Sequence, residues 1–199
     1  MAYVILGLGN PGGEYTKTRH NAGRMVAELL AEKEGFAFAL KKPAQAIVAT
    51  GDVDGEKVVI ALPETMMNLS GKSAAALVKS KAAAKKLLVI RDELDLPLGV
   101  IKMTVPGRGS GGHKGIESIM RALKTKDFVQ MKVGISPATL KGKLKKPAGE
   151  DKVITHVLGK FSPKEEVLLK KTLARAADAS RLFVTDGLEK AMLVANTSS

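Results

Sequence analysis

The chain has 199 residues, a formal net charge of +12, a pI near 9.8 and no cysteine. This length fits a single globular domain, and the lack of cysteine excludes disulfides and thiolate metal sites. The first apolar run is too short for a signal peptide, and no run approaches the roughly 20 residues of a membrane-spanning helix, so we expect a cytoplasmic protein without a membrane partner. The positive charge predicts a polyanionic partner such as nucleic acid.

The first sixty residues predict one helix and three strands. Residues 3–8 are a short apolar run typical of a buried strand, and residues 21–34 have apolar side chains at helical spacing. Two further strands are expected at residues 46–53 and 57–62. The Asp54-Gly55 pair between them is typical of a type I′ hairpin turn, which argues against a purely parallel sheet.

The middle of the chain predicts a helix followed by two strands. The helix is expected at residues 70–81 and the first strand at residues 87–90, ending at Arg91-Asp92. Residues 100–105 predict the second strand. A glycine-rich loop follows at residues 106–112, and its backbone N–H groups are suited to binding an anion at the start of the next helix.

The last third of the chain is expected to be mainly helical. A helix at residues 113–123 precedes the last strand at 129–135, and the Lys-, Gly- and Pro-rich residues 137–151 predict a mobile loop. A capping box, SPKE, starts the C-terminal helices at residues 162–196. The whole pattern predicts one three-layer α/β/α domain, residues 1–199, with a mixed, mostly parallel sheet.

Three glycines after the first strand match the GxGxxG spacing of dinucleotide-binding proteins, namely Gly7, Gly9 and Gly12. In that fingerprint the helix begins inside the motif, whereas Pro11-Gly12-Gly13 should delay it here. An acidic residue is also expected at the end of a second strand, and this region predicts a helix instead. Nucleotide-cofactor binding is therefore a weak alternative, and we expect no cofactor.

His20 and Asp92 are the residue pair best suited to acid–base chemistry. His20 follows the loop after the first strand, and Asp92 ends a second apolar strand. If these strands are parallel neighbours, both side chains reach one cleft. A carboxylate beside an imidazole fixes its tautomer and raises its basicity, so His20 could remove a proton from water. The alternative for Asp92 is a helix or turn cap.

Other polar residues have a structural and a functional interpretation. Asn68 is either a helix N-cap or an amide that binds a peptide group, and Asn10 either forms an Asx turn or contacts substrate. Ser110 lacks the GxSxG context of a nucleophile. The three histidines, His20, His113 and His156, lack HExxH spacing, so we expect no metal site.

Four segments resemble bacterial-type peptidyl-tRNA hydrolases in order and spacing: GLGNPGGEYTKTRHNAG, PETMMNLSG, DELDLPLG and GSGGHKG. The resemblance extends over nearly the whole chain. It implies a monomeric α/β/α enzyme that cleaves the ester between peptide and tRNA without a metal or organic cofactor. It further implies that His20 is the general base, that Asp92 supports it, and that Asn10 helps to distinguish peptidyl from aminoacyl esters.

The resemblance also implies two sets of substrate contacts. The residues expected to contact substrate are Tyr15, Asn21, Met66, Met67, Asn68, Gly112, His113 and Lys114. The residues expected to bind tRNA phosphates are Lys102, Arg108 and Lys132. Phosphate contacts without sequence readout suit an enzyme that accepts all tRNAs, and the 4% aromatic content argues against base stacking as the main source of affinity.

Several positions depart from the family pattern. The family usually has Asn at the position of Lys114, Phe at that of Met66 and Arg at that of Lys132, and it often has a second basic residue where Thr104 stands. Lys cannot accept a hydrogen bond as Asn can, so Lys114 is expected to bind the tRNA 3′ end. The alternative function is a catalytically silent RNA-binding relative of the same fold.

Overall fold

The computed structural model describes residues 1–137 and 144–197. In this part of the chain seven strands form one sheet in the order β2-β3-β4-β1-β5-β7-β6. The strands are β1 (Tyr3–Gly7), β2 (Ala39–Lys41), β3 (Ala46–Val53), β4 (Glu56–Pro63), β5 (Leu87–Pro97), β6 (Ile101–Thr104) and β7 (Val129–Ser136). Parallel pairings join the central strands β4, β1, β5 and β7, and antiparallel pairings lie at both edges, so the predicted mixed sheet is confirmed.

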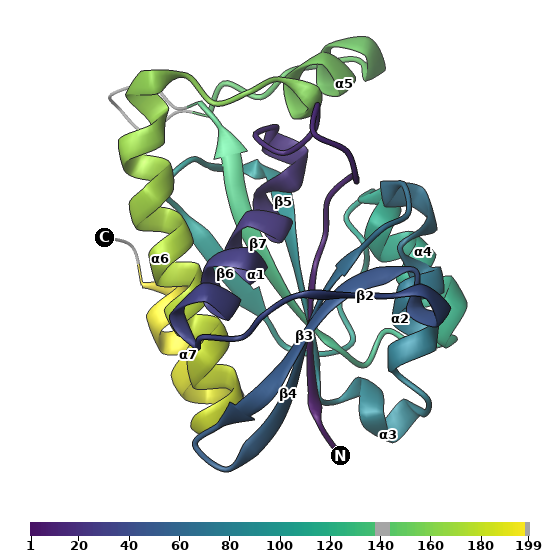
Figure 1. Ribbon diagram of the computed structural model, residues 1–199. Helices are drawn as coiled ribbons and strands as arrows, with labels where there is room; N and C mark the ends of the chain where they lie inside the picture. The colour runs from purple at the N-terminus through teal and green to yellow at the C-terminus, as the bar shows by residue number, and fades with distance from the viewer. Residues whose placement is uncertain (138–143, 198–199) are drawn as a thin grey trace.

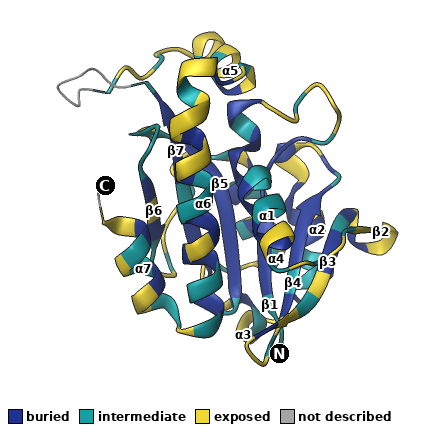
Figure 2. Ribbon diagram, turned by 60° about the vertical axis from the view of Figure 1, so that its left-hand side comes forward, coloured by how far each residue is buried: buried dark blue, intermediate teal, exposed yellow. Residues whose placement is uncertain are grey.

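Helices cover both faces of this sheet, as the predicted three-layer domain requires (Figure 1). One face packs against α1 and α6, and the other against α2 and α4, because each face of the central strands carries its own apolar cluster. Figure 2 shows the central strands buried between these layers. The α-helices are α1 (Ala22–Lys33), α2 (Gly71–Leu77), α3 (Lys81–Ala84), α4 (Lys114–Leu123), α5 (Glu150–Leu158), α6 (Pro163–Thr185) and α7 (Leu188–Asn196). Short 3-10 turns are η1 (Arg19–Asn21), η2 (Lys42–Ala44) and η3 (Met67–Leu69).

The hairpin and the C-terminal helices agree with the sequence-based predictions. Asp54 and Gly55 both have positive φ, 51° and 87°, as a type I′ turn requires, and β3 pairs with β4 in antiparallel register. The capping box at Ser162 starts α6, and α7 follows it to Asn196. None of the described helices is both long and apolar enough to cross a membrane.

The predicted helix at residues 70–81 is wrong in its extent. The structure divides it into α2 and α3, separated by Val78, which is extended and buried. Ser80 then caps the new short helix by accepting a hydrogen bond from Ala83 N–H. Burial of Val78 in the core outweighs the local helical preference of the alanine-rich segment.

The segment 137–151 agrees only in part with the predicted mobile loop. Residues 138–143 lie outside the described residues, so that part of the prediction stays untested. Residues 145–149 are irregular, but Glu150 already begins α5, a helix that the sequence pattern did not indicate. Lys146 joins this segment to the end of β5 through an ion pair with Asp95.

Strand β5 continues well beyond the predicted end at Arg91-Asp92 and reaches Pro97. Its neighbour β1 is parallel, as predicted, but β1 stops at Gly7, which lies opposite Ile90. On its other side β5 stays paired with β7, where Asp92 lies opposite Val133. Asp92 therefore lies where one neighbouring strand has ended, next to the loop that leads from β1 to α1.

Candidate active site

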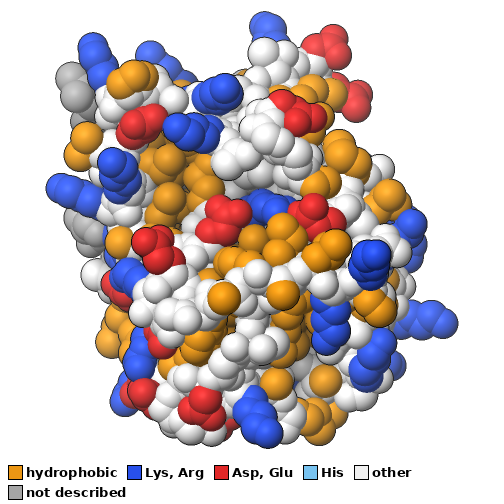
Figure 3. Space-filling view, in the orientation of Figure 1, with side chains coloured by type: hydrophobic (Ala, Val, Ile, Leu, Met, Phe, Trp, Pro, Cys, Tyr) orange, Lys and Arg blue, Asp and Glu red, His pale blue; other side chains and the backbone are white. Residues whose placement is uncertain are grey.

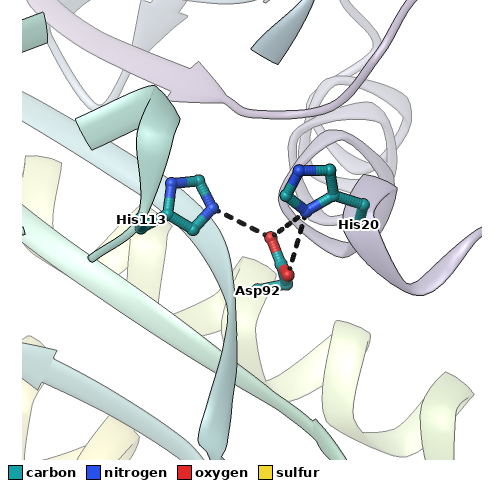
Figure 4. Close-up of side chains that lie close together, drawn as sticks. All are labelled: His20, Asp92 and His113. Carbon is teal, nitrogen blue, oxygen red and sulfur yellow. Dashed lines mark hydrogen bonds and ion pairs between the residues drawn. The ribbon is translucent and has the colours of Figure 1, made fainter. Parts of the chain in front are cut away.

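Two histidines contact the same carboxylate at this end of the sheet (Figure 4). His20, in η1, has Nδ1 3.0 Å from both Oδ1 and Oδ2 of Asp92. His113, which caps α4, has Nε2 3.0 Å from Asp92 Oδ1. The expected proximity of His20 and Asp92 is thus confirmed, and the second histidine is a contact that sequence reasoning missed.

Hydrogen bonds assign a different tautomer role to each ring. His113 Nδ1 accepts the backbone N–H of Ile116 at 3.4 Å, so its proton lies on Nε2, which donates to Asp92. His20 donates from Nδ1 to Asp92, which leaves Nε2 as the nitrogen able to accept a proton. The side chains of Asp92 and His113 are 3% and 7% exposed, whereas that of His20 is 18% exposed. His20 is therefore the ring that substrate can reach.

The pKa values of these three groups move in different directions. Burial opposes the charged form of His20, but the charge of Asp92 and its hydrogen bond outweigh burial and raise the pKa above 6.5. Burial lowers the pKa of His113, and the nearby Arg91 and His20 lower it further, against the effect of Asp92. Burial alone would raise the pKa of Asp92, but the two imidazoles hold it far below its usual range.

The three side chains could also be considered as metal ligands. Ligand atoms of His20, Asp92 and His113 lie within 4.8 Å of one another. A metal bound at His113 Nε2 would move the ring proton to Nδ1, where it would face the N–H of Ile116. The capping hydrogen bond therefore disfavours this set as a metal site.

A cleft of about 380 Å³ opens over His20, Asp92 and His113. One wall is apolar and comes from α5 and Leu94, whereas the rest carries charged groups of both signs. The lining residues are His20, Arg91, Asp92, Glu93, Leu94, Asp95, Gly111, Gly112, His113, Lys114, Lys146, Glu150, Val153, Ile154 and Val157. The α5 wall was not expected from the sequence, because its irregular apolar pattern lies in a Lys- and Gly-rich segment.

Asn10 and Asn21 connect the loop before His20 to η3. Asn21 accepts the N–H of Asn10 at 2.9 Å and donates to its carbonyl at 3.0 Å. Asn10 Oδ1 accepts the N–H of Met67 at 2.8 Å, so Asn10 bridges two distant segments and does not form a local Asx turn. Both asparagines line a smaller hollow of about 220 Å³ with Arg24, Glu28 and Glu64. Neither asparagine lines the cleft over His20.

The remaining residues expected to contact substrate differ in exposure. Met66 is 45% exposed and Asn68 is also exposed, but the side chain of Met67 is buried in the core beneath α4. Tyr15 is half-buried, and none of these four residues lines either hollow. Ser70, not Asn68, occupies the N-cap position of α2, so the capping interpretation of Asn68 is wrong.

The glycine loop has fewer free N–H groups than the sequence suggested. Gly107 donates to Lys126, Gly112 donates to Ser110 Oγ, and His113 donates to the Ser110 carbonyl. These three groups are therefore occupied within the protein. Lys114, at the first position of α4, has a 73% exposed side chain that lies 3.6 Å from Glu117 and lines the cleft.

The expected phosphate-binding cations lie on β6, β7 and the glycine loop. Lys102 and Lys132 are directly opposite each other in the antiparallel β6–β7 pair, and Arg108 is exposed on the loop. Lys132 Nζ lies 2.9 Å from Glu93, which also pairs with the buried Arg91 at 3.1 Å. Arg91 and Glu93 were not predicted as part of the site, and the strand, expected to end at Arg91-Asp92, continues past both of them.

Charge elsewhere is mixed. On the face shown in Figure 3, Lys and Arg side chains are mixed with Asp and Glu side chains over much of the surface, whereas the lower right carries Lys and Arg alone. Lys132 is distinguished from other cations by its ion pair with Glu93, which lines the cleft.

Comparisons with known proteins agree with this fold. A family model described as peptidyl-tRNA hydrolase matches residues 4–199. The peptidyl-tRNA hydrolase of Nocardia farcinica is 40% identical over 189 residues, which cover 94% of this chain and 93% of the relative. That of Chloroflexus aggregans is 40% identical over 193 residues, which cover 96% of each chain.

A solved structure has the same architecture. The crystal structure of peptidyl-tRNA hydrolase from Acinetobacter baumannii superposes with a TM-score of 0.87 at 34% sequence identity. The match covers 100% of this chain and 96% of the other. The three-layer fold and the order of its elements are therefore shared over their full length.

Proposed function

This chain belongs to the peptidyl-tRNA hydrolase family, and we propose that it hydrolyses the ester between peptide and tRNA with His20 as the general base. The single observation that supports this most is the bidentate contact between His20 Nδ1 and Asp92, which leaves Nε2 as a proton acceptor at a cleft. The reaction releases free tRNA and peptide.

His20 begins the reaction by taking a proton from water. Its pKa above 6.5 makes Nε2 a stronger base than a free imidazole. The imidazolium that forms is stabilised by Asp92, whose low pKa keeps the carboxylate ionised during the proton transfer. The hydroxide attacks the ester carbonyl, and His20 then donates its proton to the departing ribose oxygen.

The developing oxyanion requires hydrogen-bond donors. The amide nitrogen of Asn10 has no partner among the described residues, and its oxygen is fixed by Met67, so this amide is held in one orientation. The exposed amide of Asn68 is a second donor close in sequence to that anchor. One such donor contributes about 3 kcal/mol of transition-state stabilisation in related chemistry.

Binding of tRNA is proposed to use Lys102, Arg108 and Lys132. Ammonium and guanidinium groups bind phosphates without reading bases, which fits a substrate class that includes every tRNA. Lys102 and Lys132 lie opposite each other on adjacent strands, and Lys132 pairs with Glu93, which lines the cleft, so these cations would hold the acceptor end near His20. The proposed partner is peptidyl-tRNA, and the proposed catalytic species is a monomer without metal.

The proposal is tested by replacing the base. His20→Ala should lower the single-turnover rate of peptidyl-tRNA cleavage about 1,000-fold or more while tRNA binding changes less than about threefold. Asp178→Ala is the control, because Asp178 pairs with Lys33 and lines no part of the cleft. If His20→Ala cleaves as fast as the parent protein, the assigned base is wrong. Retained tRNA binding with no activity in the parent protein would favour the silent RNA-binding alternative.

A further inference from the structure

Arg19, the residue before His20, is held by three separate parts of the chain. Its side chain is only 10% exposed, and Nη2 lies 2.8 Å from Glu165 of α6. Nη1 donates to the carbonyl of Ile135 near the end of β7 at 3.3 Å, and the guanidinium lies 4.7 Å from the centre of the Phe161 ring. Few surface ion pairs are built this way, because most keep their side chains in water.

The backbone of Arg19 and of the residue before it is also fixed. Arg19 N–H donates to the carbonyl of Gly159 at 3.0 Å, and Thr18 forms an isolated antiparallel bridge with Lys160. The segment between α5 and α6 therefore pairs with the two residues that precede His20. In the loop before them, residues 12–14, 16 and 17 are exposed.

The acidic partner of Arg19 is itself rigidly placed. Glu165 is the third residue of α6, the N3 position of its capping box, and accepts both the N–H and the hydroxyl of Ser162 at 2.8 Å. Burial opposes its ionisation, but the hydrogen bonds from Arg19 and Ser162 outweigh burial and lower its pKa to about 2. The carboxylate therefore stays charged, and Arg19 stays paired, at every pH at which the enzyme could work.

We propose that Arg19 is a positioning residue. Contacts with the start of α6, with Phe161 and with the end of β7 hold its guanidinium in place. The η1 turn is thereby fixed so that His20 Nδ1 stays on Asp92. The inference rests on the proposed function, in which His20 is the base. One hydrogen bond from His20 Nδ1–H is shared between the two oxygens of Asp92, and a displacement of about 1 Å in such a site can cost about 100-fold in rate.

A purely structural role for Arg19 makes a different prediction. A buried ion pair that only joins α6 to the rest of the fold would lower the melting temperature when broken but leave the pKa of His20 unchanged. The titratable groups that face His20 are Asp92 from β5 and His113 from the start of α4. The titratable groups that face Arg19 are Glu165 and His156, and neither of them acts directly on the pKa of His20.

The experiment compares Arg19→Gln, Arg19→Lys and Glu165→Gln with the parent protein. We measure kcat, KM, melting temperature and the pKa of His20 by NMR titration of its ring proton. For Arg19→Gln we expect kcat to fall about 10- to 100-fold, KM to change less than about twofold, and the pKa of His20 to fall. Arg19→Lys keeps one charge–charge contact and should be intermediate. Glu165→Gln carries the test if Arg19→Gln does not fold.

Arg181→Gln is the control. Arg181 is on the same helix as Glu165, but it pairs with Glu34 and Asp54, which line no part of the cleft. It should change neither kcat nor the pKa of His20. Folded Arg19 and Glu165 variants that keep both quantities at parent values would overturn the proposal. The NMR readout needs no turnover, so the two proposals can fail separately. If His20→Ala stays active, the proposed function is contradicted. If the pKa of His20 still depends on Arg19 in that case, the positioning role remains.

Discussion

The starts of α1 and α4 each bring a histidine to Asp92, and the two behave differently. His20 in η1 keeps a nitrogen directed away from Asp92 and has a raised pKa, whereas His113 uses both nitrogens within the protein and has a lowered pKa. The occupied second nitrogen of His113 arises from one hydrogen bond, from Ile116 N–H to Nδ1, and its lowered pKa arises mainly from burial. Contact with a carboxylate therefore does not by itself make a histidine a base, since the second ring nitrogen must also be free.

Removing the shared charge should have the largest effect on this comparison. In Asp92→Asn the side chain has no negative charge and one carboxylate oxygen becomes an NH2 donor, so neither imidazole keeps its contact with a charged carboxylate. We expect kcat to fall about 1,000-fold and the pKa of His20 to drop, because its charged form loses the carboxylate. Rate–pH profiles and NMR titration would measure both. Asp178→Asn, an exposed acid paired with Lys33, should match the parent; equal activity of Asp92→Asn and this control would contradict the account.

Replacing His113 should have an intermediate effect and separate its two contacts. His113→Ala loses both the cap of α4 and the bond to Asp92, whereas His113→Asn restores only the cap. We expect kcat to fall about tenfold in both variants. The melting temperature of His113→Asn should exceed that of His113→Ala by a few degrees, which corresponds to about 1 kcal/mol of capping. A kcat that recovers together with the melting temperature would show that the Asp92 contact has no catalytic effect.

The cations on β6 and β7 should affect binding and leave chemistry unchanged. In Lys132→Gln we expect KM to rise about tenfold, kcat to stay within twofold, and the slope of log K against log salt to decrease by about 0.7 to 1. Lys79→Gln, an exposed lysine after α2, serves as the control for charge. An unchanged salt slope in Lys132→Gln would remove Lys132 from the phosphate contacts.

Lys114→Asn should have the smallest effect. The ammonium of Lys114 pairs with Glu117. A positive charge close to His20 would lower the pKa of that ring, but the pKa is raised, so we expect Lys114 to have no direct effect on the base. Loss of one exposed cation at the cleft should weaken tRNA binding about two- to threefold while kcat holds, as measured by filter binding and single-turnover cleavage. If binding and activity both match the parent, Lys114 does not contact the tRNA 3′ end.

The link between His20 and Asp92 could be predicted because it depends on local patterns. Two apolar strands each end in a polar residue or loop, and parallel neighbours bring such ends together. Packing explains Gly7 of the GxGxxG match, because a Cβ there would lie 2.6 Å from Ala27 Cβ. The helix α1 begins only at Ala22, long after the motif, whereas the dinucleotide-binding fingerprint has its helix start inside the motif. The catalytic and substrate-binding roles of the individual residues stay predictions.

The missed features depend on contacts between distant parts of the chain. Nothing near residues 91–97 in the sequence reports that β7 continues alongside β5, so the strand seemed to end at Asp92. The bond between His113 and Asp92 likewise requires the position of α4 on the sheet. The apolar side chains of α5 line the cleft, and the composition of the segment does not indicate this position.

The most direct test of the central claim is to titrate His20 and His113 in one NMR sample and to compare them with the rate–pH profile of cleavage. A base must be neutral to accept a proton, so activity should rise with pH through the pKa of His20, with a midpoint above 6.5. His113 should titrate below 6.5. An acidic limb that follows His113, or a His20 that titrates below it, would contradict the account.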